Sequence, residues 1–350
     1  MFKHRVLITA VSGALGPQNI NFMKNSIKGD VWVLGVDVKH NYVAENNANE
    51  FALVPLGNTK KYISRIQELI NLHKITMVLP CSDEEAINLS RNREVIESKS
   101  TLLATAKIST IKTISNKILT YNFFKKVGIT VPDFRVCNNE LELIKHASNF
   151  YQERGSFVIK DAIARGNRGT ILVDKTIKGR QDYMGSRELH MGWEYFNDNF
   201  KKFVDQTFPK LITERLYEPC YDIDVLSKDG KLINAIARER INPAGVPYHG
   251  NIMRNNNKLT NLAKKVSEYL ELTWLYDIDI MTRKDGTPVL LEVNPRPSGS
   301  SAASMQCGVP LYKNLLELFE RDDFQEKNYF VDGTIISPSF ICNVIKPKIK

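Results

Sequence analysis

The residues best suited to chemistry lie in one stretch near the carboxyl end of the chain, residues 290–301. An apolar run leads into Glu292, and Asn294 follows two positions later. Side chains alternate along a β-strand, so these two side chains point to the same face. Mg²⁺ prefers hard oxygen ligands shared between carboxylates and phosphates, and Arg296 adds a cation directly after them. The segment therefore predicts half of a site for Mg²⁺ and a polyphosphate.

Composition sets bounds on the chain but does not select a function. Its 350 residues can bury more than one core, so two or three lobes are expected. Lys and Arg outnumber Asp and Glu by 48 to 39, a net charge of +9, yet the basic residues are dispersed. No aromatic-interleaved basic module occurs. We therefore rank nucleic-acid binding last and expect no nucleic-acid partner.

Cysteines and apolar segments indicate the compartment. The five cysteines are isolated, with no C-x-x-C pair and no cysteine–histidine spacing suited to zinc. They are expected to be reduced thiols. The first residues contain no sufficient signal-peptide core, and no window approaches the ~20 apolar residues that a membrane span needs. A cytoplasmic protein with no membrane partner is expected.

The first hundred residues alternate between strand and helix patterns. Strands are expected at 5–11, 31–36, 51–54 and 77–79, with helices ending near Lys24 and spanning 61–72. This order predicts a parallel sheet with its functional loops at the carboxyl ends of the strands. Gly13 and Gly16, with Asp37, lack the three-glycine spacing of a dinucleotide site, so a tight turn is at least as good an interpretation. Residues 82–85 either cap the next helix or contact a substrate.

The middle of the chain predicts a glycine-rich hairpin. A helix over 115–127 is followed by strands at 157–160 and 170–173, joined by a loop that contains Gly166 and Gly169. The backbone N–H groups of such a loop, with Arg165 and Arg168, could bind an anion; an ordinary solvated hairpin is the equal alternative. Residues 178–210 are expected to form irregular helix. Further strands are expected at 211–214, 221–227, 232–241, 274–282 and 289–294, and helices at 259–270 and 311–319.

Together these features resemble one family, the ATP-grasp enzymes, in the carbamoyl-phosphate-synthase-like branch of carboxylate–amine ligases. The resemblance covers most of the chain and rests on residues 292–296 and 298–302, with Lys117, Lys160 and Glu214 in the right order. It implies an α/β protein with the ATP-grasp fold. A Rossmann-like pre-ATP-grasp domain is expected over 1–106, a small lobe with a glycine-rich lid over 107–177, and a large lobe over 178–350.

The resemblance assigns residues to the nucleotide. Lys117 and Lys160 match the two cations held against nucleotide phosphates, where a point charge suits a shifting phosphoryl group. Glu214 and Leu216 match the hinge that reads adenine, with the Glu214 carboxylate accepting from the exocyclic amine. Loop contacts are expected from Arg165, Gly166, Arg168 and Gly169.

It also assigns the metal and the reacting groups. Asp279 matches the first metal ligand, Glu292 the bridging ligand and Asn294 a second contact, while Asp277 shares their face and could replace or assist Asp279. The catalytic arginines, expected near the transferred phosphoryl and the acyl phosphate, are Arg296 and Arg238. The substrate carboxylate is expected at Ser298, Gly299, Ser300 and Ser301, beside a helix start.

Two positions depart from the family pattern. The family carries a glutamate for the ribose hydroxyls just before residue 221, whereas this chain has Cys220. Glu218 could substitute for it. The proline usual after the second lysine is replaced by Asp161.

The implied reaction is ligation through an acyl phosphate. ATP phosphorylates a carboxylate, an amine displaces the phosphate, and ADP and phosphate are released. The implied cofactors are ATP and Mg²⁺, with Mn²⁺ as a substitute, and the partners are small-molecule carboxylate and amine substrates, with a homodimer left open. The alternatives are carbamoyl-phosphate-type phosphorylation of a small carboxyl substrate and a non-catalytic ATP-binding module.

Overall fold

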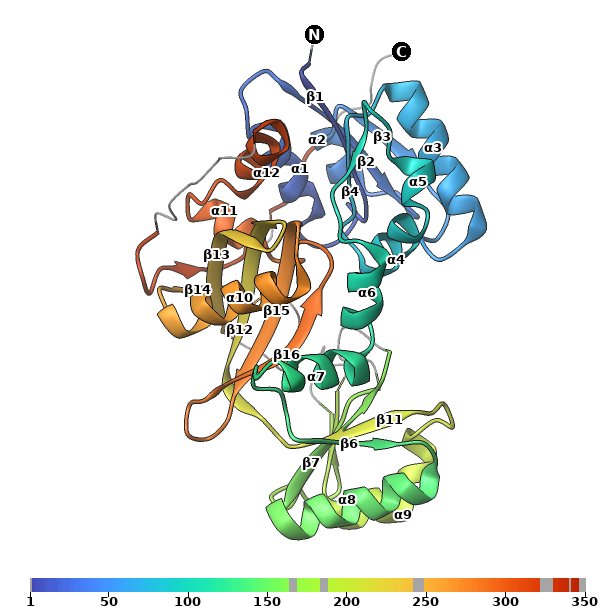
Figure 1. The fold of residues 1–350 in the computed structure, drawn as a ribbon, viewed down its shortest axis with the longest axis vertical. Coiled ribbons are helices and arrows are strands. Elements are labelled where there is room, and N and C mark those ends of the chain that lie inside the picture. Colours follow the sequence, from blue (N-terminus) through green and yellow to red (C-terminus); the bar gives the residue numbers. More distant parts are fainter. Residues whose placement is uncertain are drawn as a thin grey trace.

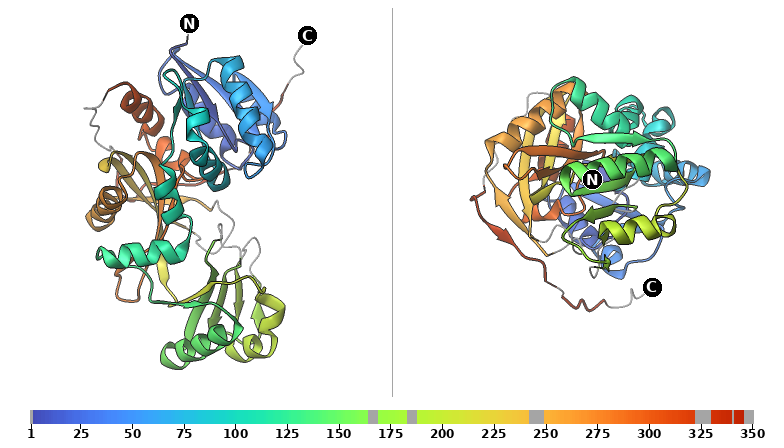
Figure 2. Two further views of the ribbon diagram at one scale, coloured as in Figure 1. Left: turned by 45° about the vertical axis from the view of Figure 1, so that its right-hand side comes forward. Right: turned by 90° about the horizontal axis from the view of Figure 1, so that it is seen from below.

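A computed structural model of the chain describes residues 2–163, 169–182, 188–241, 249–321, 330–339 and 341–345. Within these residues, three β-sheets with flanking helices follow one another along the chain (Figure 1). Figures 1 and 2 show the first sheet and the second at opposite ends of the molecule, with the third sheet between them.

The first sheet is parallel and has the strand order β3-β2-β1-β4-β5. Its strands are β1 (His4–Ile8), β2 (Val31–Asp37), β3 (Glu50–Leu53), β4 (Met77–Leu79) and β5 (Leu102–Leu103). Its helices are α1 (Gly16–Lys24), α2 (Tyr42–Asn47), α3 (Lys60–His73), α4 (Asp83–Arg91) and α5 (Arg93–Ile96). The predicted β-α-β order and parallel sheet are confirmed.

The glycine turn after β1 packs a helix on a strand. A Cβ at Gly16 would lie 2.0 Å from the Val11 backbone oxygen, so no larger residue fits there. The Ser12 N–H donates to Asp37 Oδ2 over 2.8 Å, which ties the turn to the end of β2. The close packing at Gly16 and the hydrogen bond to Asp37 explain the glycine-containing turn as a structural feature.

The second sheet, here the small-lobe sheet, has the order β6-β11-β7-β8-β10-β9. Its strands are β6 (Phe134–Cys137), β7 (Ser156–Asp161), β8 (Ile171–Asp174), β9 (Arg180–Gln181), β10 (Leu189–Met191) and β11 (Lys210–Thr213). Helices α8 (Glu140–Arg154) and α9 (Trp193–Phe203) cover one face, with Phe150 and Phe196 in the shared core. Helices α6 (Ile108–Ile114) and α7 (Lys117–Lys126) lead into this lobe.

The expectation of irregular helix over 178–210 is wrong in part. The segment contains β9 and β10 before α9 begins at Trp193. Strands of two and three residues are too short to show the period-2 alternation that identifies a strand. Strands β9, β10 and β11 lie in the same sheet as β6, β7 and β8, so the small-lobe sheet continues to Thr213, past the predicted boundary at 177/178.

The third sheet, here the large-lobe sheet, is antiparallel with the order β16-β15-β12-β13-β14-β17. Its strands are β12 (Tyr217–Lys228), β13 (Lys231–Arg240), β14 (Asn251–Arg254), β15 (Trp274–Thr282), β16 (Pro288–Asn294) and β17 (Ile335–Ile336). Helix α10 (Asn257–Leu270) packs on one face, where Ile223 and Ile278 meet Ala263 and Val266. Alternation along the strands leaves the polar side chains on the opposite face.

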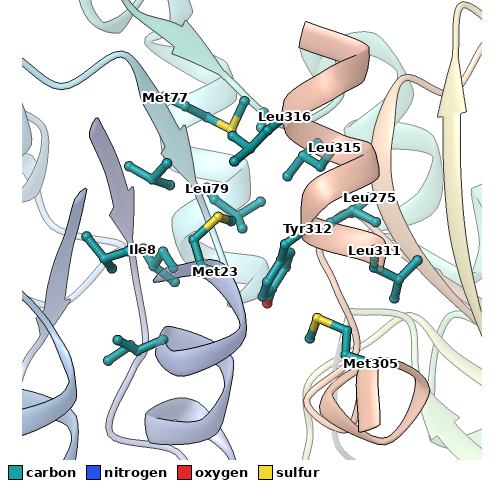
Figure 3. Packing of buried hydrophobic residues seen from close by; sticks show 14 of the residues in the cluster. Ile8, Met23, Met77, Leu79, Leu275, Met305, Leu311, Tyr312, Leu315 and Leu316 are labelled. Atoms are coloured by element: carbon teal, nitrogen blue, oxygen red, sulfur yellow. The ribbon is translucent and has the colours of Figure 1, made fainter. Parts of the chain in front are cut away.

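The first sheet and the large lobe share one hydrophobic core. After α11 (Ala302–Gln306), helix α12 (Leu311–Glu320) lies across from β1 and β4. Figure 3 shows Tyr312 and Leu316 of α12 facing Met23 and Leu79 of the first sheet's layer. Burying large apolar side chains across such a contact is the dominant stabilising term, at about 1.5–3 kcal/mol for each. The two parts are therefore one packed body.

No helix in the described part of the chain is both long and apolar enough to cross a membrane.

Candidate active site

The polar face of the large-lobe sheet carries two rows of acidic and amide side chains. Asp279 of β15 pairs with Glu292 of β16 and with Asp222 of β12. In the next row Asp277 pairs with Asn294, whose Nδ2 donates to Asp277 Oδ2 over 3.2 Å. The predicted pairing of Asp279 with Glu292 is therefore confirmed. Two side chains from β15, two from β16 and one from β12 meet on one face, as cross-strand neighbours do.

Two lysines from the small-lobe side reach this face. Lys117 Nζ lies 2.5 Å from Glu292 Oε1, and the backbone N–H of Lys117 donates to Ala162 O. Lys160, near the end of β7, is close enough for its charge to act on Glu292. Burial opposes ionisation of Glu292, but the charges of Lys117 and Lys160 outweigh it and lower the pKa of this carboxyl. Glu292 is thus held as an anion between two cations.

Three aspartates on this face could hold a metal ion. Asp222, Asp277 and Asp279 each offer a carboxylate oxygen, and these oxygens lie within 4.8 Å of one another. Among the described residues, the buried Oδ1 of Asp277 has no hydrogen-bond partner. A set of hard carboxylate oxygens with one unused buried acceptor fits Mg²⁺. Asp277 thus joins the group predicted for the metal.

Asp222 and Arg240 were missed by the sequence reasoning. Arg240 Nη2 donates to Asp279 Oδ1 over 2.9 Å and also to Asp222. Burial, and after it the charge of the Asp222 carboxylate, raises the pKa of Asp277 to about 7. The period-2 alternation of Asp222 and Asp224 with Ile223 and Val225 is the signal that could have found the extra acidic positions.

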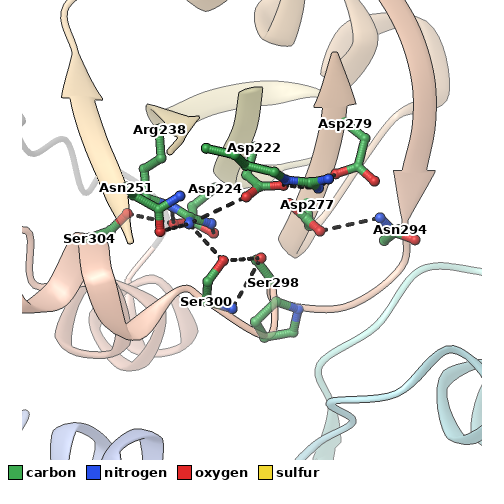
Figure 4. A network of polar contacts seen from close by, with 12 residues as sticks. Asp222, Asp224, Arg238, Asn251, Asp277, Asp279, Asn294, Ser298, Ser300 and Ser304 are labelled. Atoms are coloured by element: carbon green, nitrogen blue, oxygen red, sulfur yellow. Dashed lines mark hydrogen bonds and ion pairs between the residues drawn. The ribbon is translucent and has the colours of Figure 1, made fainter. Parts of the chain in front are cut away.

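Arg238, predicted to lie near the transferred phosphoryl and the acyl phosphate, is fully buried, and its predicted catalytic role is untested. Its side chain is 0% exposed, and it donates to Asp224 from Nε over 2.8 Å and to Ser300 Oγ from Nη1 over 2.7 Å (Figure 4). Asn251 Oδ1 accepts from Nη1 as well, at 3.1 Å. A fully buried guanidinium needs this many acceptors. The structure therefore makes Arg238 the support of the polar face, and Arg240 is the arginine on β13 that reaches the cavity described below.

Arg296 links the polar face to the first sheet. Its Nη1 lies 3.1 Å from Asp277 Oδ2, and its Nε lies 3.1 Å from Asp83 Oδ1 at the start of α4. The 82–85 segment, which could cap a helix or contact a substrate, does cap α4 through Ser82, and Asp83 also binds Arg296. The predicted catalytic role of Arg296 stays a prediction.

The serine turn after β16 lies mostly under the surface. Ser298, Ser300 and Ser301 are buried, and Gly299 is exposed. Ser298 Oγ and Ser300 Oγ lie 3.1 Å apart, and Ser300 accepts from Arg238 (Figure 4). The helix that follows, α11, is only five residues long. The buried serines therefore shape the polar face, and their predicted contact with a substrate carboxylate is untested.

A cavity of about 470 Å³ opens between the two lobes. Its apolar walls are Val158, Leu172, Met281 and Leu291. Its polar walls include Lys160, Cys220, Arg240, Asp279 and Glu292. This volume falls in the range of small-molecule sites. Leu216 and Glu218 also line the cavity. Leu216 is buried, and Glu218 is exposed.

The Glu214 carboxylate is engaged by protein groups, and its predicted contact with adenine stays a prediction. The Asp133 N–H donates to Oε1 over 2.9 Å, Arg283 Nη2 to Oε1 over 2.8 Å, and Arg154 Nη1 to Oε2 over 3.3 Å. Arg154 comes from α8 of the small lobe and Arg283 from the turn after β15. Both carboxylate oxygens, predicted to accept from an adenine amine, thus already accept from protein donors. Glu214 thus joins Arg154 of the small lobe to Arg283 of the large lobe.

The glycine-rich loop is described in part. Arg165, Gly166 and Arg168 lie outside the described residues. Gly169 has φ +70°, and a Cβ there would lie 2.3 Å from Asp161 Oδ2, so only glycine fits. Asp161 also binds Lys210 Nζ at 2.5 Å, which gives the residue found in place of the family's proline a structural use.

A second cavity, of about 330 Å³, adjoins the first at Leu291 and Glu292, which line both. It lies between α4, α6, α7 and the edge strand β16, with mainly apolar walls that include Ile87, Ile114 and Val293. Asp83 and Glu84 line it as well. Two adjoining cavities around Glu292 leave room for a second small molecule beside the first.

Comparisons with known proteins define the class of fold. The family described as "ATP-grasp in the biosynthetic pathway with Ter operon" matches residues 206–337. The chain is similar in structure to N5-carboxyaminoimidazole ribonucleotide synthetase in complex with ADP, with a TM-score of 0.68 and 16% identity over 91% of this chain and 77% of that one. The predicted ATP-grasp fold is thereby confirmed: the chain is an ATP-grasp protein in its fold.

Two further solved structures are similar to this chain. The L-amino acid ligase from Bacillus licheniformis aligns with a TM-score of 0.63 and 12% identity over 91% of this chain and 74% of that one. The biotin carboxylase domain of Hydrogenobacter thermophilus 2-oxoglutarate carboxylase, bound to MgADP, ADP and bicarbonate, aligns with a TM-score of 0.64 and 15% identity over 94% of this chain and 72% of that one. No curated protein matches the sequence at a significant level.

Proposed function

We propose that this protein is an ATP-dependent, ADP-forming carboxylate–amine ligase. The observation that carries the proposal is the convergence of Lys117 and Lys160 on Glu292, at the wall of a cavity of nucleotide size. Fixed cations beside a buried carboxylate suit a metal-bound polyphosphate. The ATP-grasp fold supports the same assignment.

The nucleotide is proposed to lie along the larger cavity. Apolar Leu172 and Met281 would enclose the base beside the 214–216 hinge. Because the Glu214 carboxylate is engaged by two arginines, the hinge backbone is the part assigned to adenine. The phosphates then point toward Lys160 and Lys117.

Mg²⁺ is assigned to Asp279, Glu292 and Asn294, with Asp277 and Asp222 beside them. Bound there, it would neutralise phosphate charge and act as a Lewis acid on the transferred group. Lys117 and Lys160 hold the phosphate oxygens as negative charge moves toward ADP. Mn²⁺ has the same preference for oxygen ligands and could replace it.

The reaction has two steps. A carboxylate oxygen of the first substrate attacks the γ-phosphorus, and the bond from that phosphorus to the ADP oxygen breaks. The amine nitrogen of the second substrate then attacks the acyl carbon, and the bond to phosphate breaks as the nitrogen loses its proton. The smaller cavity beside Glu292 is proposed for these substrates. The cytoplasmic location and a homodimer remain predictions.

The experiment is ADP and phosphate release from Mg-ATP across a matrix of carboxylates and amines. ADP formation that requires both a carboxylate and an amine, with a matching amide product by mass spectrometry, is the expected result. Binding of ATP without turnover on any pair would favour the non-catalytic module.

Bicarbonate belongs in the same matrix as a second candidate substrate. One structurally similar protein was crystallised with bicarbonate and MgADP. ADP formation driven by bicarbonate alone, without an organic carboxylate, would point to phosphorylation of a small carboxyl group.

A further inference from the structure

The smaller cavity is acidic on one side and apolar on the other. Asp83 and Glu84 lie in the first turn of α4, and Ile87 lies one turn further along it. Residues three or four positions apart share one face of a helix, and one turn rises about 5.4 Å. All three side chains line the cavity, and Ile114 of α6 and Val293 of β16 add to its apolar wall. A ligand in this cavity therefore meets carboxylates at the start of α4 and apolar side chains one turn further along.

The acidic side lies beside the proposed reaction centre. Arg296 contacts Asp83 Oδ1 through Nε and Asp277 Oδ2 through Nη1, each over 3.1 Å. One guanidinium group thus connects the start of α4 to the polar face of the large-lobe sheet. Glu292, on that same face, lines both cavities. A charged group bound at the start of α4 is therefore next to the place proposed for the acyl phosphate.

Charge favours an amine over a carboxylate on this side of the cavity. Among the described residues that line it, the charged side chains are three carboxylates, those of Asp83, Glu84 and Glu292, and one cation, Lys117. That cation contacts Glu292 over 2.5 Å. The start of α4 contributes about half a positive charge, which is less than the charge of the two carboxylates in its first turn. An ammonium group is therefore attracted here, and a substrate carboxylate is repelled.

The apolar walls limit what the rest of the amine can carry. The side chains of Ile87, Ile114, Leu291 and Val293 offer no hydrogen-bond donor or acceptor. A second charged group against them would lose its hydration without gaining a partner. Each methylene group buried there should instead improve binding about fourfold. A cavity of about 330 Å³ is small for a ligand site and suits a short chain.

We propose that the smaller cavity binds the amine substrate and selects a primary amine with a short apolar chain and no second charged group. The ammonium group lies at Asp83 and Glu84, and the chain lies along Ile87 and Ile114. The ammonium loses one proton to water before the attack, and the second proton leaves with the released phosphate. This inference rests on the proposed ligase function and names the class of its amine.

The test compares kcat/KM for a series of amines, with the full-length protein, Mg-ATP and a carboxylate that supports ADP release. From methylamine to butylamine, kcat/KM is expected to rise about fourfold with each methylene group. The compounds 1,4-diaminobutane and 4-aminobutanoate carry a charge at the far end of a similar chain. Both should be at least about tenfold poorer than butylamine. A series without a slope, or equal values for the charged amines, would overturn the inference.

A change in the apolar wall should act on the chain and not on the ammonium group. Ile87→Thr places a hydroxyl on that wall and keeps the branched side chain. It should lower kcat/KM for butylamine by about fivefold or more and that for methylamine by less than about twofold. Ile63→Thr, at a half-buried isoleucine of α3 that does not line the cavity, is the matched control and should leave the series unchanged. Equal losses for both amines in Ile87→Thr would contradict the proposed position of the chain.

A change at the acidic side should act on every amine alike. Glu84→Gln removes an exposed carboxylate of the cavity, and kcat/KM should fall about two- to fivefold for methylamine and butylamine, as expected for an exposed ion pair. Glu94→Gln, an exposed change on α5, is the control and should have no effect. An unchanged or increased value in Glu84→Gln would overturn the assignment of the ammonium group to the start of α4.

The remaining outcomes separate this inference from the proposed function. If Ile87→Thr changes the dependence on chain length for carboxylates, from acetate to pentanoate, and not for amines, the cavity binds the carboxylate. The inference is then overturned, and the ligase function stands. If no pair of carboxylate and amine supports ADP release, the proposed function and the inference fail together. The dissociation constant of Mg-ATP and the free energy of unfolding, measured for each variant, show whether a loss comes from the fold.

Discussion

Lys117 Nζ lies 2.5 Å from Glu292 Oε1, although the two residues belong to a helix that enters the small lobe and to an edge strand of the large lobe. The pair joins the lysine proposed for the phosphates to the carboxylate proposed for the metal. Lys117 also donates its backbone N–H to Ala162, which follows the end of β7. A single helix start thus connects both lobes at the place proposed for phosphoryl transfer.

Glu292→Gln should abolish substrate-dependent ADP formation, by at least about a hundredfold, because charge stabilisation at the transferred group is worth that much. The amide keeps the shape of the side chain but loses the charge that holds Lys117 and the metal. The measurement is the initial rate of ADP release. Glu268→Gln, an exposed change on α10, serves as the matched control and should leave the rate unchanged. Undiminished turnover in Glu292→Gln would refute the metal assignment.

Arg238→Met should destabilise the protein by about 3–5 kcal/mol, because it leaves the buried Asp224 without its cation. Urea unfolding followed by circular dichroism gives the free energy of unfolding. Adding Asp224→Asn to Arg238→Met should recover part of that loss, since it removes the uncompensated charge. If the double variant is as unstable as the sum of the single ones, the pair is not coupled as the 2.8 Å contact indicates.

Glu85 should make stability depend on pH. Burial raises the pKa of this α4 carboxyl to about 7, although the hydroxyls of Thr9 and Ser82 donate to it and lower the pKa. The folded carboxyl keeps its proton where the unfolded one, with a pKa of about 4.3, has lost it. The contribution of Glu85 to the free energy of unfolding is therefore complete below about pH 4.3, and it is lost as the pH rises through 7.

Glu85→Gln removes this titration. Between pH 5 and pH 8, the free energy of unfolding of the unmodified protein should fall by about 2–3 kcal/mol relative to Glu85→Gln. Asp277, whose pKa is also raised to about 7, is present in both proteins and cancels in the difference. Parallel pH profiles for the two proteins would contradict a protonated Glu85.

Glu214→Gln should preserve the preference for ATP over GTP, because the hinge backbone and not the carboxylate is assigned to the base. It should lower stability by about 1–3 kcal/mol through weaker contacts to Arg154 and Arg283. Competition binding of ATP and GTP gives the preference, and thermal unfolding gives the stability. Loss of base preference with unchanged stability would return the adenine contact to the carboxylate.

The elements with regular patterns were predictable from the sequence, and the site was predictable where it followed those elements. Strand alternation placed Glu292, Asn294 and Asp279 on one face, and the structure has that register. Strand alternation alone could not place Asp222 beside Asp279, because the pairing of β12 with β15 is set by the tertiary structure.

The contacts that the sequence could not show have a common physical cause, since they join residues that are distant along the chain. The contacts of Arg238 depend on how deeply its side chain is buried. The sequence does not show that Asp224, Asn251 and Ser300 surround it. The contacts of Glu214 depend on Arg154 and Arg283, which come from distant parts of the chain. Strands β9 and β10, the second of which carries His190, are too short to leave a periodic pattern.

The packing of α12 on the first sheet has a practical consequence for dissecting this protein. A shortened chain that begins after residue 106 would keep every proposed ATP contact but leave Tyr312, Leu315 and Leu316 facing water. Such an exposed apolar patch drives self-association. We therefore expect the part proposed to bind the nucleotide to need the amino-terminal hundred residues for solubility, because they bury this patch. Insertion or fusion sites are better sought in the small lobe, which has a hydrophobic core of its own.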